Sequence, residues 1–188
     1  MKLTGGRARG RRLRMPRIEG LRPTSARLRE ALFDVLGARI HGASFLDVFA
    51  GTGAIGLDAL SRGAARAVFI EADRRAARAI AGNVALSGVA GSARIVEGDA
   101  EVALLELVRT GERFDIVFLD PPYTAGALDR ALAAAARLLR SGAVMVVEHA
   151  SRRAFQTPDL AGLRRGRRYV HGDSALSVLH LDEAPTPT

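Results

Sequence analysis

Short apolar runs alternate with amphipathic stretches along most of the chain. The runs have the length and composition of buried strands, and the stretches between them repeat apolar residues at helical spacing. The predicted strands are 44–50, 67–70, 93–96, 114–119 and 143–147, and the predicted helices are 24–36, 57–61, 73–86, 102–108 and 128–139. Strands that alternate with helices indicate an α/β fold with a doubly wound, mostly parallel, Rossmann-like sheet.

The sequence also predicts details inside these helices. Thr24 is expected to be the N-cap of the first helix, and Gly37 its end. Ser141-Gly142 is expected to end the last helix. Asn83 is expected to be a surface or capping residue of helix 73–86. The residues of that helix expected to face the core are Ala77, Ile80, Ala81 and Val84.

The pattern becomes more alternating near the end of the chain. Apolar residues in 169–171 and 176–181 flank a Gly172-Asp173 turn signal. This arrangement predicts a terminal antiparallel hairpin, which would bring the sheet to seven strands. Residues 184–188 are expected to form a flexible tail.

The first 22 residues follow neither pattern. Gly5-Gly6 and Gly10 separate short apolar-basic segments, which is typical of a β-hairpin. A hairpin this short cannot bury a core of its own, so we expect it to lie on the main domain or on a partner. The predicted organisation is therefore a hairpin arm at 1–22 and one α/β domain at 23–183.

Composition excludes several classes of protein. A chain of 188 residues that is 48% hydrophobic can form one domain that buries roughly 70% of its unfolded surface. The absence of cysteine excludes disulfides, zinc-thiolate sites and a thiol nucleophile, and the four histidines lack metal-ligand spacing. No apolar run approaches the roughly 18 residues of a membrane span, and the basic start lacks the apolar core of a signal peptide. We expect a soluble, cytoplasmic, monomeric protein without a metal.

The net charge of +8 is unevenly distributed. Residues 1–29 hold ten basic side chains and one acidic one, so the excess positive charge lies in this part of the chain. A local positive field suits a polyanion, and arginine matches phosphate geometry. A solvated basic tail is the alternative. The candidate phosphate contacts are Arg7, Arg9, Arg11, Arg12 and Arg22, and a second cluster at Arg164, Arg165, Arg167 and Arg168 also favours nucleic acid.

A glycine-rich loop follows the first strand. Gly51-Thr52-Gly53 begins a G-x-G-x-x-G spacing between a predicted strand and a predicted helix, which is the context that a nucleotide-binding loop requires. Glu71 ends the second strand, where an acid can accept hydrogen bonds from both ribose hydroxyls of a cofactor. These features leave nicotinamide-cofactor binding and S-adenosylmethionine binding both open.

Two acidic residues favour the methyl donor. Asp47 ends the first strand four residues before Gly51, where it can face the cationic methionine amino group and would repel a pyrophosphate. Asp99-Ala100 follows the third strand, where Asp99 can accept a hydrogen bond from the exocyclic amine of adenine. Asp99 can equally be the N-cap of the next helix, and the two roles are compatible.

The fourth strand ends at Asp120-Pro121-Pro122-Tyr123. The prolines cannot donate to a sheet, so they stop the strand abruptly and fix a carboxylate and an aromatic ring at its carboxyl end. Ligands bind at that edge of open α/β sheets. An ordinary Asp-Pro turn is the alternative.

Several segments together resemble the bacterial 16S ribosomal RNA guanine-N2 methyltransferase family. They are Arg22-Pro23-Thr24, Arg29-Glu30-Ala31-Leu32-Phe33, the stretch 46–53, Ala59-Leu60-Ser61-Arg62-Gly63-Ala64 and Asp120-Pro121-Pro122-Tyr123. The glycine loop alone is weakly specific, and Asp-Pro-Pro-Tyr is shared with N6-adenine methyltransferases. The basic arm and the Ala-Leu-Ser-Arg-Gly-Ala segment carry the finer assignment. Asp58 departs from the family, which commonly has glutamate there.

The resemblance implies a class I methyltransferase that uses S-adenosylmethionine to methylate N2 of a guanine in 16S rRNA, within the small ribosomal subunit or an assembly intermediate. Asp120 and the Pro121 carbonyl would accept hydrogen bonds from the amine, and Tyr123 would stack on a flipped base. Whether Asp120 or water takes the proton is left open. The alternatives are an N6-adenine methyltransferase, a nicotinamide-dependent oxidoreductase and a non-catalytic RNA-binding module.

Overall fold

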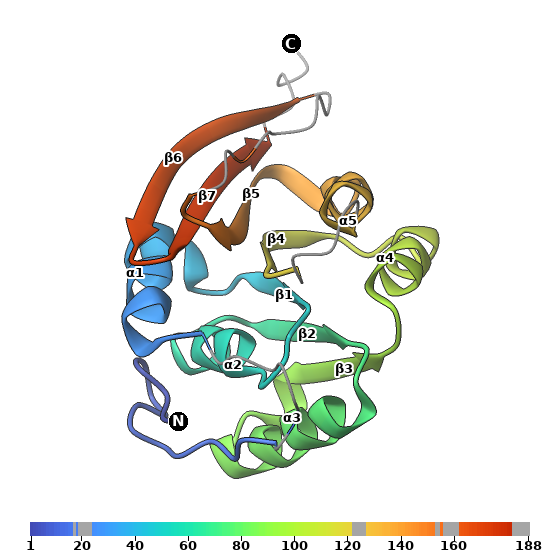
Figure 1. Ribbon diagram of the computed structural model, residues 1–188. Helices are drawn as coiled ribbons and strands as arrows, with labels where there is room; N and C mark the ends of the chain where they lie inside the picture. Colours follow the sequence, from blue (N-terminus) through green and yellow to red (C-terminus); the bar gives the residue numbers. More distant parts are fainter. Residues whose placement is uncertain (17, 19–23, 122–126, 153–154, 156–161, 182–188) are drawn as a thin grey trace.

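The chain forms one seven-stranded sheet with helices on both faces (Figure 1). The computed structural model describes residues 1–16, 18, 24–121, 127–152, 155 and 162–181. The strands are β1 (Ser44–Val48), β2 (Arg66–Glu71), β3 (Ala93–Glu97), β4 (Phe114–Leu119), β5 (Leu139–Ala150), β6 (Leu163–His171) and β7 (Ser174–Leu181). Their order is β3-β2-β1-β4-β5-β7-β6, and only the pairs that involve β7 are antiparallel. The predicted sheet and terminal hairpin are confirmed.

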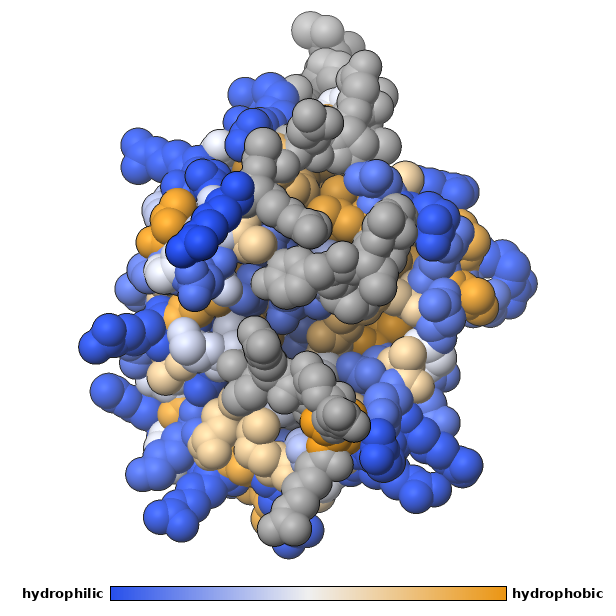
Figure 2. Space-filling model, in the orientation of Figure 1, coloured by the Kyte–Doolittle hydropathy of each residue, from blue (hydrophilic) through white to orange (hydrophobic). Residues whose placement is uncertain are grey.

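Among the described residues, five α-helices cover the sheet. They are α1 (Ala26–Leu36), α2 (Ala54–Ser61), α3 (Arg74–Ser87), α4 (Ala100–Arg109) and α5 (Ala127–Ala136), with 3-10 turns at Gly37–Ile40 and Ala90–Ser92. Buried side chains of α1, α2 and α3 belong to one apolar cluster, and those of α4 and α5 to another on the opposite face. The outline of the molecule carries mostly hydrophilic side chains with hydrophobic patches between them (Figure 2).

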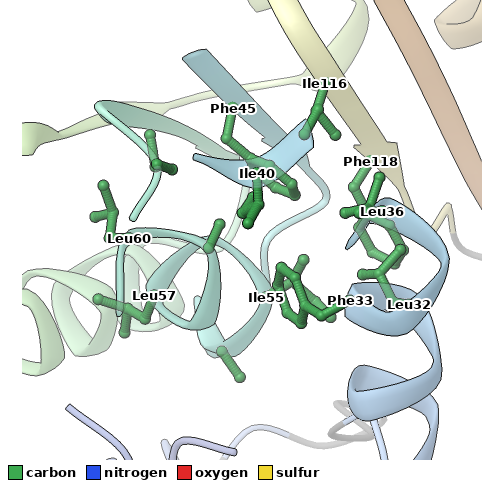
Figure 3. Packing of buried hydrophobic residues seen from close by; sticks show 14 of the residues in the cluster. Leu32, Phe33, Leu36, Ile40, Phe45, Ile55, Leu57, Leu60, Ile116 and Phe118 are labelled. Atoms are coloured by element: carbon green, nitrogen blue, oxygen red, sulfur yellow. The ribbon is translucent and has the colours of Figure 1, made fainter. Parts of the chain in front are cut away.

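The apolar cluster under α1 and α2 identifies the face of the sheet on which the candidate site lies. Phe33 of α1 and Ile55 of α2 lie close together, below Phe118 of β4 in the view of Figure 3. These side chains are at most 5% exposed, and burying each contributes about 1.5–3 kcal/mol. Strand residues alternate between the two clusters, so the face on which each strand residue lies is determined by its position.

The N-terminal arm packs on this α1–α2–α3 layer. Leu3, Ala8 and Leu13 are buried in its apolar cluster, while the arginines between them are exposed. The two sides of the arm meet at one antiparallel bridge between Lys2 and Arg12. The predicted hairpin is therefore anchored on the main domain.

Several predicted details are wrong. Ser25, not Thr24, is the N-cap of α1, since its side chain accepts a hydrogen bond from the Leu28 N–H. Ala81 is exposed, because the buried stripe of α3 runs through Ala76, Ala77, Ile80 and Val84. The helix predicted at 128–139 ends at Ala136, and Ser141-Gly142 lies inside β5, since Leu139 already pairs with Phe114 of β4.

Asn83 is also placed wrongly by the prediction, because its side chain is fully buried. Within the described residues, no helix is long and apolar enough to cross a membrane.

Candidate functional site

The carboxyl ends of β1, β2 and β4 bring most of the predicted site residues together. Asp47 of β1 pairs in register with Phe69 of β2 and Phe118 of β4, so Glu71 and Asp120 lie two positions further along the neighbouring strands. The glycine loop 51–53 leaves β1 between them. The fold therefore places residues that are more than 70 positions apart in the sequence at one edge of the sheet.

Acidic side chains hold the glycine loop in place. Glu71 accepts hydrogen bonds from the Gly51 N–H at 2.6 Å and the Asp73 N–H at 2.8 Å. Asp47 accepts one from the Gly56 N–H at 2.9 Å. A carboxylate has about four acceptor positions, so Glu71 retains capacity for the hydroxyl groups of a ligand.

The loop makes a sharp turn into α2. Phe49 has φ 64°, a left-handed conformation that is unusual for a bulky residue and is often found at functional sites. Gly56 lies against β2, where an added Cβ would come within 2.3 Å of the Phe69 ring. The third glycine of the motif thus permits close packing of α2 on the sheet, while Gly51-Thr52-Gly53 forms the turn itself.

Asp47, Asp120 and Glu148 project from one face of the sheet. Each follows by two positions a strand residue of the cluster under α1 and α2, namely Phe45, Phe118 and Val146. Burial, followed by the charge of Glu148, raises the pKa of Asp120 to about 7. Burial also raises the pKa of Asp47 well above its usual value. The hydrogen bond from Gly56 lowers this pKa in part, whereas the charges of Asp120 and Glu71 raise it further.

Burial is the largest cause of each raised pKa, and the site gathers three carboxyl groups on one face. Burial raises the pKa of Glu148 too, and its neighbour Ser174 offsets part of that rise. No positively charged side chain among the described residues contributes to the pKa shifts of these three carboxyl groups. A site of this kind stabilises a positively charged ligand and disfavours a pyrophosphate.

Asp99 and Ala100 lie at the start of α4, beside Glu71. The Asp99 Oδ1 caps the helix by accepting hydrogen bonds from Glu101 N at 2.9 Å and Val102 N at 3.1 Å, so its predicted N-cap role is confirmed. The Gly98 N–H donates to the Glu71 carbonyl at 3.0 Å, which holds this turn against the end of β2.

The Asp-Pro-Pro-Tyr turn is described in part. The Asp120 N–H donates to the Val48 carbonyl at 3.4 Å, which ties the turn to the end of β1, and Pro121 is buried. Pro122, Tyr123 and the arm residue Arg22 lie outside the described residues.

The basic arm borders the glycine loop. The Thr52 hydroxyl lies 3.9 Å from the Met1 sulfur, and Asn83 donates hydrogen bonds to the carbonyls of Thr52 at 3.3 Å and Arg14 at 3.0 Å. Arg11 donates to the Leu86 carbonyl of α3 at 2.9 Å. Arg7, Arg9 and Arg12 are exposed on the outer side of the arm.

Sequence reasoning missed Asn83 and Glu148. Asn83 also accepts a hydrogen bond from the Arg14 N–H at 2.7 Å, so one buried amide joins the arm to the glycine loop. Neither its helical position nor its residue type indicates this contact. Glu148 had a usable signal, because it directly follows the apolar run 143–147 in the strand beside Asp120.

The strand order and the site at the carboxyl edge define the protein as an α/β protein with the class I methyltransferase fold. The chain belongs to the family described as Conserved hypothetical protein 95, whose model matches residues 1–179.

Similar proteins and a similar solved structure support this assignment. The chain is 44% identical over 132 residues to "Ribosomal RNA small subunit methyltransferase D" of Escherichia coli, a match that covers 70% of the chain and 65% of that protein. It is 32% identical over 161 residues to the protein of the same name from Haemophilus influenzae, covering 85% of the chain and 83% of the relative. A solved structure of a hypothetical protein from Thermus thermophilus is 37% identical, with a TM-score of 0.80, and the match covers 98% of this chain and 99% of that one.

Proposed function

We propose that this protein transfers a methyl group from S-adenosylmethionine to the exocyclic N2 amine of a guanine in 16S rRNA of the small ribosomal subunit. The observation that carries the proposal is the set of Asp47, Asp120 and Glu148 on one face of the sheet, at the edge where the glycine loop leaves β1; Asp47 and Glu148 are buried and Asp120 is half-buried. A cationic sulfonium suits this negative site, whereas a nicotinamide dinucleotide would place its pyrophosphate there. The names of the relatives supply the rRNA substrate.

The residues around the loop fit the methyl donor. Asp47 would face its amino group, and Glu71 would accept hydrogen bonds from the ribose hydroxyls. The turn Gly51-Thr52-Gly53 would lie against the donor. Asp99, with the backbone of Ala100 beside it, would hold the adenine. The bound sulfonium supplies an already activated methyl group, so these residues need only orient it.

Asp120 and Pro121 would act on the acceptor amine. The N2 lone pair is delocalised into the guanine ring, which makes the amine a poor nucleophile. Acceptors aimed at its two protons, the Asp120 carboxylate and the Pro121 carbonyl, would favour a tetrahedral nitrogen and stabilise the charge that develops. By the motif resemblance, Pro122 would shape the turn and Tyr123 would stack on the flipped base.

The arm would hold rRNA phosphates. Its buried Leu3, Ala8 and Leu13 fix the backbone, so the exposed arginines are presented on a rigid element. Phosphate contacts supply affinity without sequence information, so specificity must come from the shape of the RNA and the flipped base. Arg22 is a further candidate phosphate contact from its place in the basic sequence.

Replacing Arg7, Arg9 and Arg12 together with alanine is expected to weaken binding of small subunits at least about tenfold at moderate salt. The slope of log affinity against log salt should fall by about 2 to 3, since each lost phosphate contact removes about 0.7 to 0.9. The triple lysine variant is the matched control and should keep the slope. An unchanged salt slope in the alanine variant would show that the arm is not part of the RNA interface.

The proposed function is tested by nucleoside mass spectrometry. Purified protein and S-adenosylmethionine are added to small subunits from cells that lack the protein, and 16S rRNA is digested to nucleosides. N2-methylguanosine is the expected product. N6-methyladenine, in RNA or DNA, would identify an adenine methyltransferase, and calorimetric binding of NADH without binding of S-adenosylhomocysteine would identify an oxidoreductase.

A further inference from the structure

Glu148 lies beside Asp120 at the carboxyl edge of the sheet. Leu119 of β4 pairs in parallel register with Val147 of β5, so the next residues, Asp120 and Glu148, are level with each other. Both continue the face that carries Phe118 and Val146. Neighbouring strands are about 4.8 Å apart, so the two side chains start within contact distance of each other.

Glu148 is buried without full compensation. It is 7% exposed, and its Oε2 has no hydrogen-bond partner among the described residues. The groups that face it are Asp120 from β4 and Ser174 from β7, with Asp47 of β1 beyond Asp120. A buried carboxylate with an unpaired oxygen is costly, and an apolar side chain would serve the core better at this position. Its cost therefore calls for a functional explanation.

We propose that Glu148 is a positioning residue of the transfer step: its carboxylate, fixed one strand away on the same face, keeps Asp120 basic enough to take the proton that leaves the methylated guanine amine. This inference rests on the proposed function. In the step, the N2 lone pair forms the new nitrogen–carbon bond while the carbon–sulfur bond breaks with its electron pair on sulfur. Asp120 takes one N–H proton, the electron pair of that bond stays on nitrogen, and Asp120 then releases the proton to water.

The electrostatics of the pair support this role. An isolated carboxylate is a weak base at neutral pH, whereas burial and the Glu148 charge raise the pKa of Asp120 to about 7. General bases work best when their pKa lies near the working pH. During transfer the positive charge passes to the amine nitrogen, and it is neutralised when Asp120 takes the proton.

The test uses Glu148→Gln, which keeps the shape and removes the charge. The carboxyl carbon of Asp120 is followed by ¹³C NMR in the full-length protein without ligands as the pH is raised. Its apparent pKa is expected to fall by about one unit or more in the variant. The pH at half-maximal transfer rate should fall with it, and the plateau rate should drop about 3- to 10-fold because Asp120 has become a weaker base.

Two further variants separate the effect of the Glu148 charge from other effects of the substitution. Glu148→Asp retains the charge and is expected to keep the Asp120 pKa well above that of Glu148→Gln. Glu106→Gln removes an exposed carboxylate on α4 and should leave both the titration and the pH profile unchanged. Thermal unfolding at pH 8 is expected to show that Glu148→Gln folds at least as stably as the wild type, because a buried charge has been removed.

An Asp120 titration that does not move in Glu148→Gln would overturn the inference, and so would a shifted titration with an unchanged pH–rate profile. If Glu148→Gln does not fold, the comparison of wild type with Glu148→Asp decides, and an Asp120 pKa near 4 in either protein would overturn it. A wild-type protein that makes no N2-methylguanosine would instead refute the proposed function, while the titration would still report on the pair.

Discussion

Asp120→Ala is expected to lower the rate of methyl transfer about 10³-fold or more at saturating substrate. The change removes an acceptor that orients the amine, and it removes the group that we propose takes its proton; each effect alone is worth about 10² or more. Single-turnover transfer of labelled methyl to small subunits measures the loss. The fold should survive, because the hydrogen bond that ties the turn to β1 is donated by the backbone N–H of Asp120, which the substitution leaves in place.

Asp120→Asn separates the two roles. Asparagine keeps an oxygen that can accept from the amine but cannot take a proton at neutral pH, so we expect an intermediate loss of about 10² and no acidic limb near pH 7. The affinity for neutral S-adenosylhomocysteine, measured by calorimetry, should stay close to that of the wild type in both variants. Near-normal turnover of Asp120→Ala would refute the role given to this residue.

The sequence predicted the site edge well because that edge depends on local signals. Apolar runs marked the strands, and β4 has the predicted bounds Phe114–Leu119. A glycine loop, an acid and a proline pair then followed three of these strands. Since parallel strands place their carboxyl ends at one edge, local signals were enough to bring Asp47, Glu71 and Asp120 together.

Other features depended on contacts between distant segments. Whether Glu148 faces Asp120 is set by the register of β5 against β4, and a slip of one residue would turn it to the opposite face. The anchors of the arm, Leu3, Ala8 and Leu13, recur every five residues, which matches neither a helix nor a strand. Asn83 is a polar residue in a helix, and only its partners on the arm and the loop explain its burial.

The residue that departs from the family pattern, Asp58, is the centre of the arm's attachment. It is fully buried in α2 and forms an ion pair with Arg29 of α1. Its Oδ1 accepts from the Thr4 N–H at 2.7 Å, and Arg29 donates to the Lys2 carbonyl at 2.9 Å. The pair therefore joins two helices and the arm.

Asp58→Ala is expected to lower the free energy of unfolding by about 3 to 5 kcal/mol, because it leaves the Arg29 guanidinium buried without its partner. Urea denaturation followed by circular dichroism measures the change. At the same time Thr4 loses its acceptor, so the arm should become open to limited trypsin digestion at its exposed arginines. Asp34→Ala, an exposed aspartate on α1, is the control and should change stability by less than about 0.5 kcal/mol.

The double variant Arg29→Met with Asp58→Leu separates the stability of the domain from the attachment of the arm. Apolar residues of similar volume commonly replace a buried ion pair without loss, so most of the stability lost in Asp58→Ala should return. The Thr4 N–H and the Lys2 carbonyl still lack partners in this variant, so trypsin should continue to cut the arm and the affinity for small subunits should stay reduced. If the double variant instead protects the arm and binds subunits normally, the apolar anchors Leu3, Ala8 and Leu13 are sufficient to hold it, and the ion pair serves the core alone.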